Sequence, residues 1–391
     1  MGESQRLPSL DGLRGIAAVI VLIHHALLTF PVFADSYYEM SDRGEFSVAW
    51  MLSYTPLHAF WAGEEAVYLF FVLSGIVLVL PVMRAGRRFS WLSYYPRRFV
   101  RLYLPLVAAI ALGVLLVFLF PRTQDPDLGA WMNARRGPYT LTALFEDVTL
   151  LFGPSGIISP LWSLKWEVAF SLMLPIFVLL AVVARKLWWL KLVGIFGLIF
   201  VGSVAGSTFL FFLPIFAVGT LLISEWDRVT RGAHRLDQTR WGWPATIVLA
   251  AILTTFNWCL LGFGAPESIL SFTGWVPVAG VALFVVIGAF YSPTRRFLES
   301  RPVAWLGTIS FSLYLVHEPM LISARLATFP ASPWVGIAIA VPVAFLVAWL
   351  FAKYVEQPSH RLSKWVGARS DSMFSRGTTQ SPNEPRIVGA P

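Results

Sequence analysis

The chain has 391 residues, of which 57% are hydrophobic and 13% charged, and its formal net charge at pH 7 is +8. A soluble globular domain carries roughly 25% charged residues, so this composition excludes an ordinary soluble domain. The positive charge does not indicate a nucleic-acid partner, because basic residues between membrane spans are explained by topology.

Apolar segments of about 20 residues, the length that a helix needs to cross a hydrocarbon core, fill most of the chain. They predict an all-α, polytopic integral membrane protein with about ten transmembrane helices. The approximate spans are 12–31, 64–83, 102–120, 161–184, 188–205, 208–224, 244–262, 273–291, 303–325 and 334–354.

Two parts of this pattern depart from simple spans. The fifth and sixth segments are short enough to form one helical hairpin that turns at Gly206 and Ser207. A stretch near 141–153 is too short to span and contains Glu146 and Asp147, so we expect an interfacial or re-entrant piece.

The distribution of Lys and Arg predicts that both termini are cytoplasmic. If the N-terminus lies inside and the spans alternate, the inward segments hold 24 of the 30 basic residues, which is the positive-inside pattern. We expect residues 1–366 to form one membrane-embedded domain. Residues 367–391 are polar and rich in Pro, Gly and Ser, and we expect them to form a disordered cytoplasmic tail.

The first span carries ionisable residues along one stripe. Arg14 and His25 are eleven residues apart, so they lie about 20° apart around a helix and about 16 Å apart along it. Asp11 lies on the same side, one turn before Arg14. His25 suits a general base near mid-membrane, or it is a hydrogen-bonded packing residue. His24 points about 100° away, and we interpret it as structural.

The loop after the second span is rich in arginine and aromatic residues. Arg97, Arg98 and Arg101 open the next helix, with Arg97 and Arg101 on one face. Ordinary positive-inside topology explains such residues, but guanidinium groups beside aromatic rings also suit a phosphorylated donor such as coenzyme A.

Two later spans contain further ionisable residues. Because such residues are costly inside a membrane, we treat them as candidates for a functional role. Glu167 lies about two turns into the fourth span, and we expect Lys165 or a histidine to pair with it. His317 and Glu318 lie deep in the ninth span before Pro319, where they suit catalysis or a buried pair that holds helices in register.

Several soluble-enzyme motifs are absent. The sequence has no phosphate-binding loop, dinucleotide fingerprint, zinc-ligand spacing or serine-hydrolase elbow. Ser74 and Gly75 form a small pair that permits close helix approach. Cys259 is the only cysteine, which excludes a disulfide framework and a cysteine-based metal site, and we expect no bound metal.

Six stretches together resemble the membrane-bound acyltransferase family 3, which includes O-antigen, exopolysaccharide and macrolide O-acyltransferases. They follow the family's order along nearly the whole chain: LPSLDGLRGIAAVIVLIHHA (7–26), YLFFVLSGIVL (68–78), PRRFVRLYLP (96–105), LWSLKWEVAFSLMLP (161–175), ISFSLYLVHEP (309–319) and YVEQP (354–358). The chain is similar to the stand-alone form without an SGNH domain.

The resemblance implies a multi-pass enzyme of a bacterial plasma membrane. His25 would activate the acceptor hydroxyl, and Arg14 with Arg97, Arg98 and Arg101 would lie on the acyl-CoA side. Glu167 and His317 match the family's acidic residue and histidine. Lys165 and Trp166 depart from the usual neighbours of that acidic residue.

We therefore expect an acyl group, acetyl above all, to move from cytoplasmic acyl-CoA to a hydroxyl of a carbohydrate-containing acceptor. His25 would act as base or carry the acyl group transiently, with Glu167 and His317 orienting the acceptor. The acceptor could lie outside, as a surface glycan or glycolipid, or in the cytoplasm, as a macrolide sugar. A transporter or flippase of a lipid-linked saccharide is the alternative, with the buried His and Glu residues as a proton relay.

Overall fold

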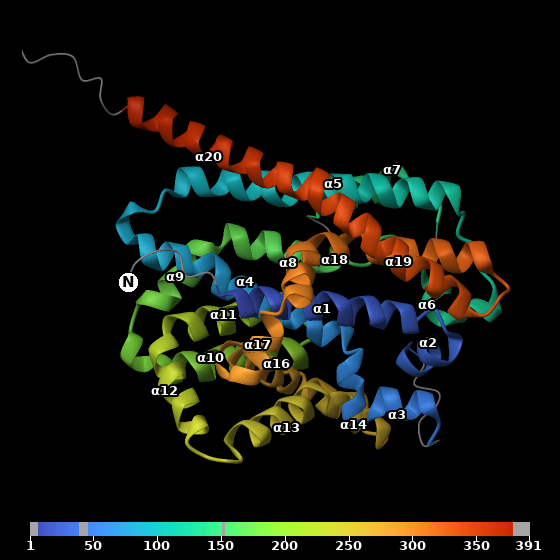
Figure 1. The fold of residues 1–391 in the computed structure, drawn as a ribbon, viewed down its shortest axis with the longest axis horizontal. Coiled ribbons are helices and arrows are strands. Elements are labelled where there is room, and N and C mark those ends of the chain that lie inside the picture. The colour runs from blue at the N-terminus through green and yellow to red at the C-terminus, as the bar shows by residue number, and fades with distance from the viewer. Residues whose placement is uncertain (1–6, 39–45, 136, 151–152, 378–391) are drawn as a thin grey trace, which may run out of the picture.

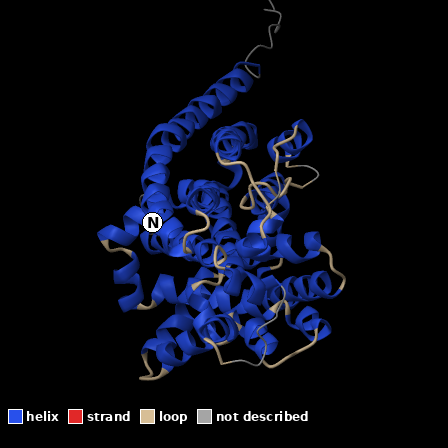
Figure 2. Cartoon of the chain, turned by 90° about the vertical axis from the view of Figure 1, so that its right-hand side faces the viewer, coloured by secondary structure: helices blue, strands red, loops and turns tan. Residues whose placement is uncertain are grey.

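The computed structural model describes residues 7–38, 46–135, 137–150 and 153–377, and this part of the chain consists of helices and loops (Figure 2). Its first ten α-helices are α1 (Pro8–Leu27), α2 (Pro31–Tyr38), α3 (Val48–Tyr54), α4 (Gly63–Ala85), α5 (Trp91–Leu119), α6 (Gly129–Ala134), α7 (Leu141–Thr149), α8 (Leu161–Leu172), α9 (Leu174–Val182) and α10 (Trp188–Val204). The others are α11 (Thr208–Ser224), α12 (Trp226–Asp237), α13 (Gly242–Thr254), α14 (Phe256–Gly262), α15 (Glu267–Thr273), α16 (Val276–Phe290), α17 (Ser292–Leu298), α18 (Arg301–Thr328), α19 (Pro333–Phe351) and α20 (Gln357–Gly377).

Short helices of other types join some of these. The 3-10 helices are η1 (Pro56–Phe60), η2 (Gly86–Arg88), η3 (Pro126–Leu128) and η4 (Arg185–Leu187), and η5 (Ala352–Glu356) is a π-helix.

The all-helical, polytopic prediction is confirmed. Six helices of the described part are long and apolar enough to cross a membrane, or up to nine if each of three bent helix pairs counts as one span. Helix α18 has the length but falls outside this set by composition, because it carries His317, Glu318 and several other polar residues. Each of the ten predicted segments falls on a helix or a bent pair, but the number of crossings and their orientation stay predictions.

Some predicted spans differ from the observed helices in shape. The fourth segment bends by 61° between α8 and α9, just before Pro175, which lacks the backbone N–H that a continuous helix needs. The seventh bends by 59° between α13 and α14. The fifth and sixth form the predicted hairpin of α10 and α11, and Gly206 makes its turn with a φ of +64°.

The C-terminal helix continues beyond the predicted tenth span. Residues 333–377 form one continuous helix that passes through η5. This π-helix ends two residues before Pro358, whose ring would clash with the preceding turn of a regular α-helix. Helical structure therefore crosses the predicted domain boundary at 366, and residues 378–391 of the expected tail lie outside the described part.

Helices α1, α4, α11 and α18 pack closely at glycines. A Cβ added to Gly75 on α4 would collide with the Phe216 carbonyl of α11, and one on Gly219 with Val72 of α4. Gly15 of α1 meets Gly307 of α18 in the same way. Small residues permit such close approach in membrane helices. The prediction for Gly75 is confirmed, whereas Ser74 beside it makes a hydrogen bond described below.

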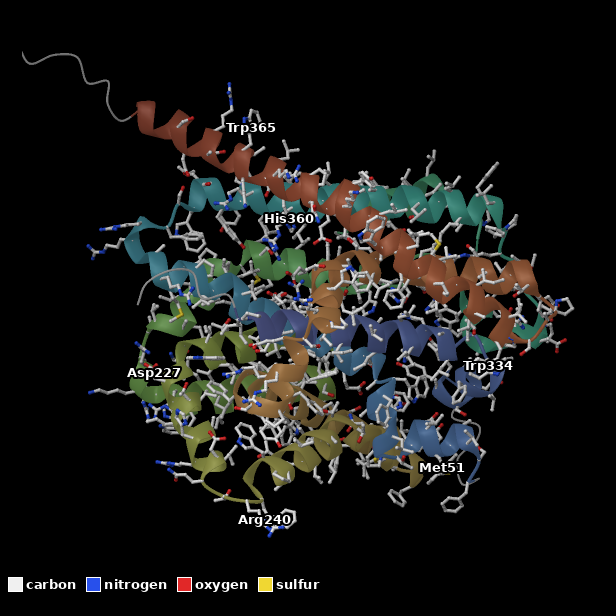
Figure 3. All side chains as sticks on the ribbon, viewed as in Figure 1. Met51, Asp227, Arg240, Trp334, His360 and Trp365 are labelled. Atoms are coloured by element: carbon white, nitrogen blue, oxygen red, sulfur yellow. The ribbon has the colours of Figure 1, made fainter. Side chains whose placement is uncertain are left out.

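The bundle has two distinct ends. In Figure 1, α1 begins and α20 ends toward the left, whereas α2, α3 and α6 gather at the right. Both ends of the described chain therefore lie at the same end of the bundle, as an even number of crossings requires. Figure 3 shows Asp227 toward the left end, with Met51 and Trp334 toward the right. Of the predicted short piece near 141–153, residues 141–149 form α7, which is too short to span, and residues 151–152 lie outside the described part.

Candidate functional site

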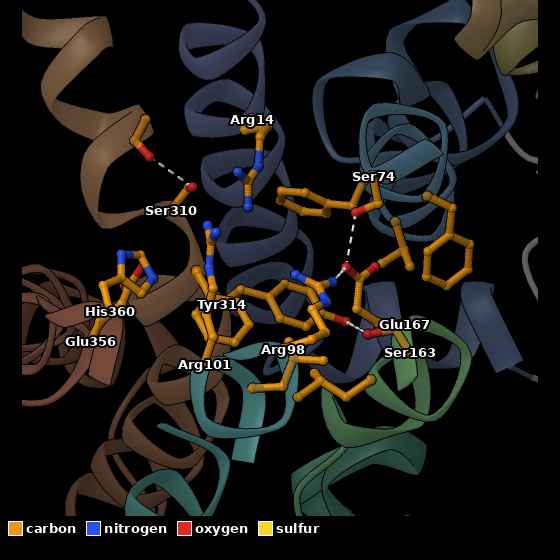
Figure 4. Close-up of a pocket in the computed structure, with 17 residues that line it drawn as sticks. Arg14, Ser74, Arg98, Arg101, Ser163, Glu167, Ser310, Tyr314, Glu356 and His360 are labelled. Carbon is orange, nitrogen blue, oxygen red and sulfur yellow. Dashed lines mark hydrogen bonds and ion pairs between the residues drawn. The ribbon is translucent and has the colours of Figure 1, made fainter. Parts of the chain in front are cut away.

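A cavity of about 110 Å³, here called the arginine cavity, lies between α1, α4, α5, α8, α18 and the junction of η5 with α20 (Figure 4). Its ionisable lining residues are Arg14, Arg98, Arg101, Glu167, Glu356 and His360. Three guanidinium groups therefore face two carboxylates, which leaves the lining with an excess of positive charge.

Arg98 and Glu167 form the fixed part of this lining. Their side chains make an ion pair, and Ser74 Oγ donates a second hydrogen bond of 3.2 Å to Glu167 Oε1. Arg98 Nε also donates to Ser171 Oγ at 2.8 Å. The expectation that Lys165 or a histidine pairs with Glu167 is wrong: the Lys165 ammonium lies over the Trp166 ring instead.

Arg14 and Arg101 differ from Arg98 in having no such partner. Figure 4 shows their guanidinium groups pointing toward one another across the cavity. Neither makes an ion pair or a hydrogen bond with any residue in the described ranges. The Glu356 carboxylate attracts both guanidinium groups across the cavity without a direct contact, while its Oε2 accepts a 2.6 Å hydrogen bond from Ser312 and its Oε1 lies 3.8 Å from His360 Nε2. Two facing, unpaired guanidinium groups are suited to binding an anionic ligand such as a phosphate.

Arg97 is not among the residues that line this cavity. It is exposed and packs against Gly367, where α5 lies beside α20. The expected common face of Arg97 and Arg101 therefore does not form the site. Arg98 and Arg101, three residues apart, face the cavity together.

A second cavity, of about 250 Å³ and here called the histidine cavity, is lined by His24 and His25 of α1. Its other polar or aromatic lining residues are Tyr37, Tyr38, Glu64, Arg135, Ser159, Trp162, Phe212 and Tyr314. Tyr38 is 46% exposed, so the cavity reaches the surface near α2.

His25 and His317 contact each other directly, although they are 292 residues apart in sequence. Nδ1 of His317 lies 2.9 Å from the Leu313 carbonyl oxygen, which can only accept, so Nδ1 of neutral His317 carries the proton. Its Nε2 then accepts from Nδ1 of His25 at 2.8 Å. Nε2 of His25 is left unprotonated, which is the state that a general base requires.

His24 has a different environment. Its Nδ1 donates to the Trp61 carbonyl at 3.0 Å, and its ring stacks on the Trp61 ring with centroids 5.4 Å apart. Gly63 packs against the same imidazole. These contacts agree with the structural interpretation of His24, even though its ring borders the histidine cavity.

Glu318 does not pair with its neighbour His317. Its carboxylate accepts from Arg135 Nε at 2.9 Å and from the Ser159 amide at 2.6 Å, and its side chain is fully buried. Burial opposes the charge on Arg135, but the adjacent Glu318 carboxylate raises the pKa of Arg135 above its usual value. Glu318 therefore holds Arg135 at the histidine cavity, and the two are a buried pair between α6 and α18.

The two cavities share only Val67 of α4 and Tyr314 of α18 among their lining residues. Tyr314 lies one turn before His317, and their ring centroids are 6.0 Å apart. The sequence did not lead us to predict Tyr314 or Arg135 as residues of the site. The three-residue spacing from His317 is a signal that could have identified Tyr314, whereas nothing local in sequence connects Arg135 with Glu318.

The sequence of this chain is similar to those of known acyltransferases. The acyltransferase domain family matches residues 7–353. The acyltransferase MdmB of Streptomyces mycarofaciens is 28% identical over 330 residues, which cover 80% of this chain and 78% of that protein. The peptidoglycan O-acetyltransferase OatA of Listeria monocytogenes is 24% identical over 90% of this chain and 55% of its own length. The O-acetyltransferase PaAT-1 of Phomopsis amygdali is 24% identical over 92% and 84%. No solved structure matches this chain.

Proposed function

This chain belongs to the acyltransferase family whose domain covers residues 7–353, and on that premise we propose that it moves an acetyl group from acyl-CoA to a hydroxyl of a carbohydrate-containing acceptor. That it is an acyl-transferring enzyme with a multi-pass membrane domain follows from the family and from its apolar helices. The donor, the acceptor and the roles of individual residues are the proposal.

The arginine cavity would receive the donor. Arg14 and Arg101 face each other without a direct carboxylate contact, and Arg98 is held by Glu167, so the excess positive charge of this cavity supports the binding of the phosphates of coenzyme A. Glu167 then acts by positioning Arg98. Arg97 lies outside the cavity and contributes only to the positive charge of the end of the bundle where the arginine cavity lies.

The histidine cavity would receive the acceptor. A sugar ring can pack an apolar face on Trp162, Tyr37 or Tyr38, while its hydroxyls bond to Glu64 and Arg135. An aromatic cavity with a few convergent polar groups is the usual form of a small-molecule site. The lining of the histidine cavity therefore supports an acceptor that carries a sugar. Its position supports entry of the acceptor from the end of the bundle opposite to the donor.

His25 would act as the general base. Its Nε2 takes the proton of the acceptor hydroxyl as the oxygen attacks the thioester carbonyl, and the thiolate of coenzyme A leaves. The imidazolium that forms on His25 keeps its hydrogen bond to His317, whose own orientation is fixed by Leu313. The single observation that carries this proposal is the 2.8 Å contact between His25 and His317 at the edge of a polar cavity.

Purified protein with labelled acetyl-CoA and a panel of sugar hydroxyl acceptors tests the proposal. His25→Ala should lower the rate of label transfer by about 10²–10⁴-fold, the usual contribution of a general base. His24→Ala is the comparison variant: it removes the neighbouring imidazole, which donates to the Trp61 carbonyl, and its folded fraction should lose far less activity than His25→Ala does. Full activity of His25→Ala would contradict the role of His25. A wild-type protein that leaves the thioester intact while moving lipid-linked sugar would favour the transporter alternative instead.

A further inference from the structure

The boundary between the two cavities is a specific hydrogen-bonded contact. The Tyr314 hydroxyl lies 2.7 Å from Ser163 Oγ and 3.3 Å from the Pro160 carbonyl, and Ser163 Oγ donates to the same carbonyl at 3.0 Å. Ser163 lines only the arginine cavity, Pro160 lines only the histidine cavity, and Tyr314 lines both. The contact therefore spans the boundary between α18 and the N-terminal end of α8.

Packing holds Tyr314 in this position. Its ring is 6% exposed, and Phe70 of α4 meets it edge-on with centroids 5.5 Å apart. Val67, one turn before Phe70 on α4, is the other residue that both cavities share. Tyr314 of α18 and Val67 of α4 therefore border both cavities.

The arginines and His25 line different cavities, and these two cavities meet at Tyr314 and Val67. We propose that Tyr314, hydrogen-bonded to Ser163 and packed against Phe70, is a partition between the two cavities that opens for the acyl group and excludes water until then. The inference rests on the proposed function, since it assigns donor and acceptor to the two cavities. Tyr314 is therefore a positioning residue: it does not touch the reacting atoms but controls whether water reaches the thioester.

The chemical reason for such a partition is the reactivity of the thioester. Water that reaches its carbonyl competes with the acceptor hydroxyl, attacks the same carbon and releases free acid and the coenzyme A thiol. Enzymes that carry reactive acyl groups exclude water from them to prevent this side reaction. The histidine cavity reaches the surface near Tyr38, so it is open to water from that end.

The ratio of acetyl-CoA hydrolysis to acetyl transfer shows how well the partition keeps water from the thioester. With acetyl-CoA as donor and a mixture of methyl glycosides as acceptor, Tyr314→Ala should raise this ratio about tenfold, a change of about 1.4 kcal/mol in relative barriers. Tyr314→Phe and Ser163→Ala, which remove the hydrogen bond but keep the ring, should raise it less. Phe311→Ala is the matched control, because Phe311 lies on α18 one turn before Tyr314 and lines only the arginine cavity. It should change the KM for acetyl-CoA without changing the ratio.

Cysteine accessibility gives a readout that does not depend on catalysis. Ser310 is buried and lines only the arginine cavity, so Ser310→Cys in a Cys259→Ser background reports access to that cavity. A membrane-impermeant thiol reagent added from the Tyr38 end should label Cys at 310 only when Tyr314→Ala is also present.

The outcomes separate the two proposals. If the wild type transfers no label, the proposed function fails. If the wild type transfers label but Tyr314→Ala changes neither the ratio nor the labelling, the partition is contradicted while the function stands. Equal effects of Phe311→Ala and Tyr314→Ala on the ratio would also overturn the partition.

Discussion

Arg97 and Arg98 are adjacent in sequence but lie in different surroundings. Arg98 faces the arginine cavity and pairs with Glu167, whereas Arg97 packs on Gly367 of α20. The i, i+4 rule identified Arg97 and Arg101 as sharing a face, but it does not say which face of a helix the neighbouring helices leave open. Only the packing of α5 against α8 and α20 decides that Arg98 is the inward residue.

A pair of arginine substitutions tests this assignment. Arg101→Ala should raise the KM for acetyl-CoA by about tenfold, which corresponds to the loss of about 1.4 kcal/mol of charge-assisted binding. Arg97→Ala removes the same charge four residues away, outside the cavity, and should leave the KM within about twofold. Steady-state kinetics at fixed ionic strength distinguishes the two variants. Equal increases would contradict the location of the donor site.

The histidines illustrate how far sequence alone can predict the site. The stripe on the first span singled out His25, and the depth of His317 in the ninth span singled out His317, so both were candidates. Their mutual hydrogen bond joins residues 292 apart in sequence and could not be predicted, because no local periodicity encodes which spans are neighbours. The role of Glu318 was undecided for the same reason, since its partner Arg135 lies 183 residues earlier.

At the scale of helices, the predicted segments correspond to helices because twenty apolar residues have few other ways to satisfy their backbone in a membrane. The bends were not predicted, although Pro175 was a signal for one of them. The continuation of the last helix beyond residue 366 was not expected either, because its polar sequence lacks the apolar pattern that marks a span. Its length becomes evident only where α20 packs along α5.

The glycine contact between α4 and α11 carries a stability prediction. Gly75→Val should lower the melting temperature in detergent, because the new side chain collides with the α11 backbone and overpacking costs roughly 1–3 kcal/mol. Gly197→Val is the control, since a Cβ there on α10 meets no atom within 4 Å. A thermal aggregation assay compares them. A melting temperature that falls equally in both variants would mean that the α4–α11 crossing is not the cause.

At the scale of the whole molecule, the two cavities lie one after the other along the bundle. Arg14 and His25 lie on one helix about 16 Å apart along its axis, and the cavities that contain them meet at Tyr314 and Val67. The basic residues on which the predicted orientation rests lie at the end of the bundle where the arginine cavity is found. Donor and acceptor would therefore approach from opposite sides of the membrane.

The most direct test of this arrangement is the initial rate of label transfer in sealed membrane vesicles of defined sidedness. Acetyl-CoA does not cross the bilayer, so external labelled donor reaches the arginine cavity only where the cytoplasmic face is outward. Inverted vesicles that enclose the acceptor should therefore transfer label to it, with no transfer in the His25→Ala variant, and right-side-out vesicles with the same enclosed acceptor should transfer none until they are permeabilised. Equal rates in intact vesicles of both orientations would contradict the separation of donor and acceptor between the two cavities.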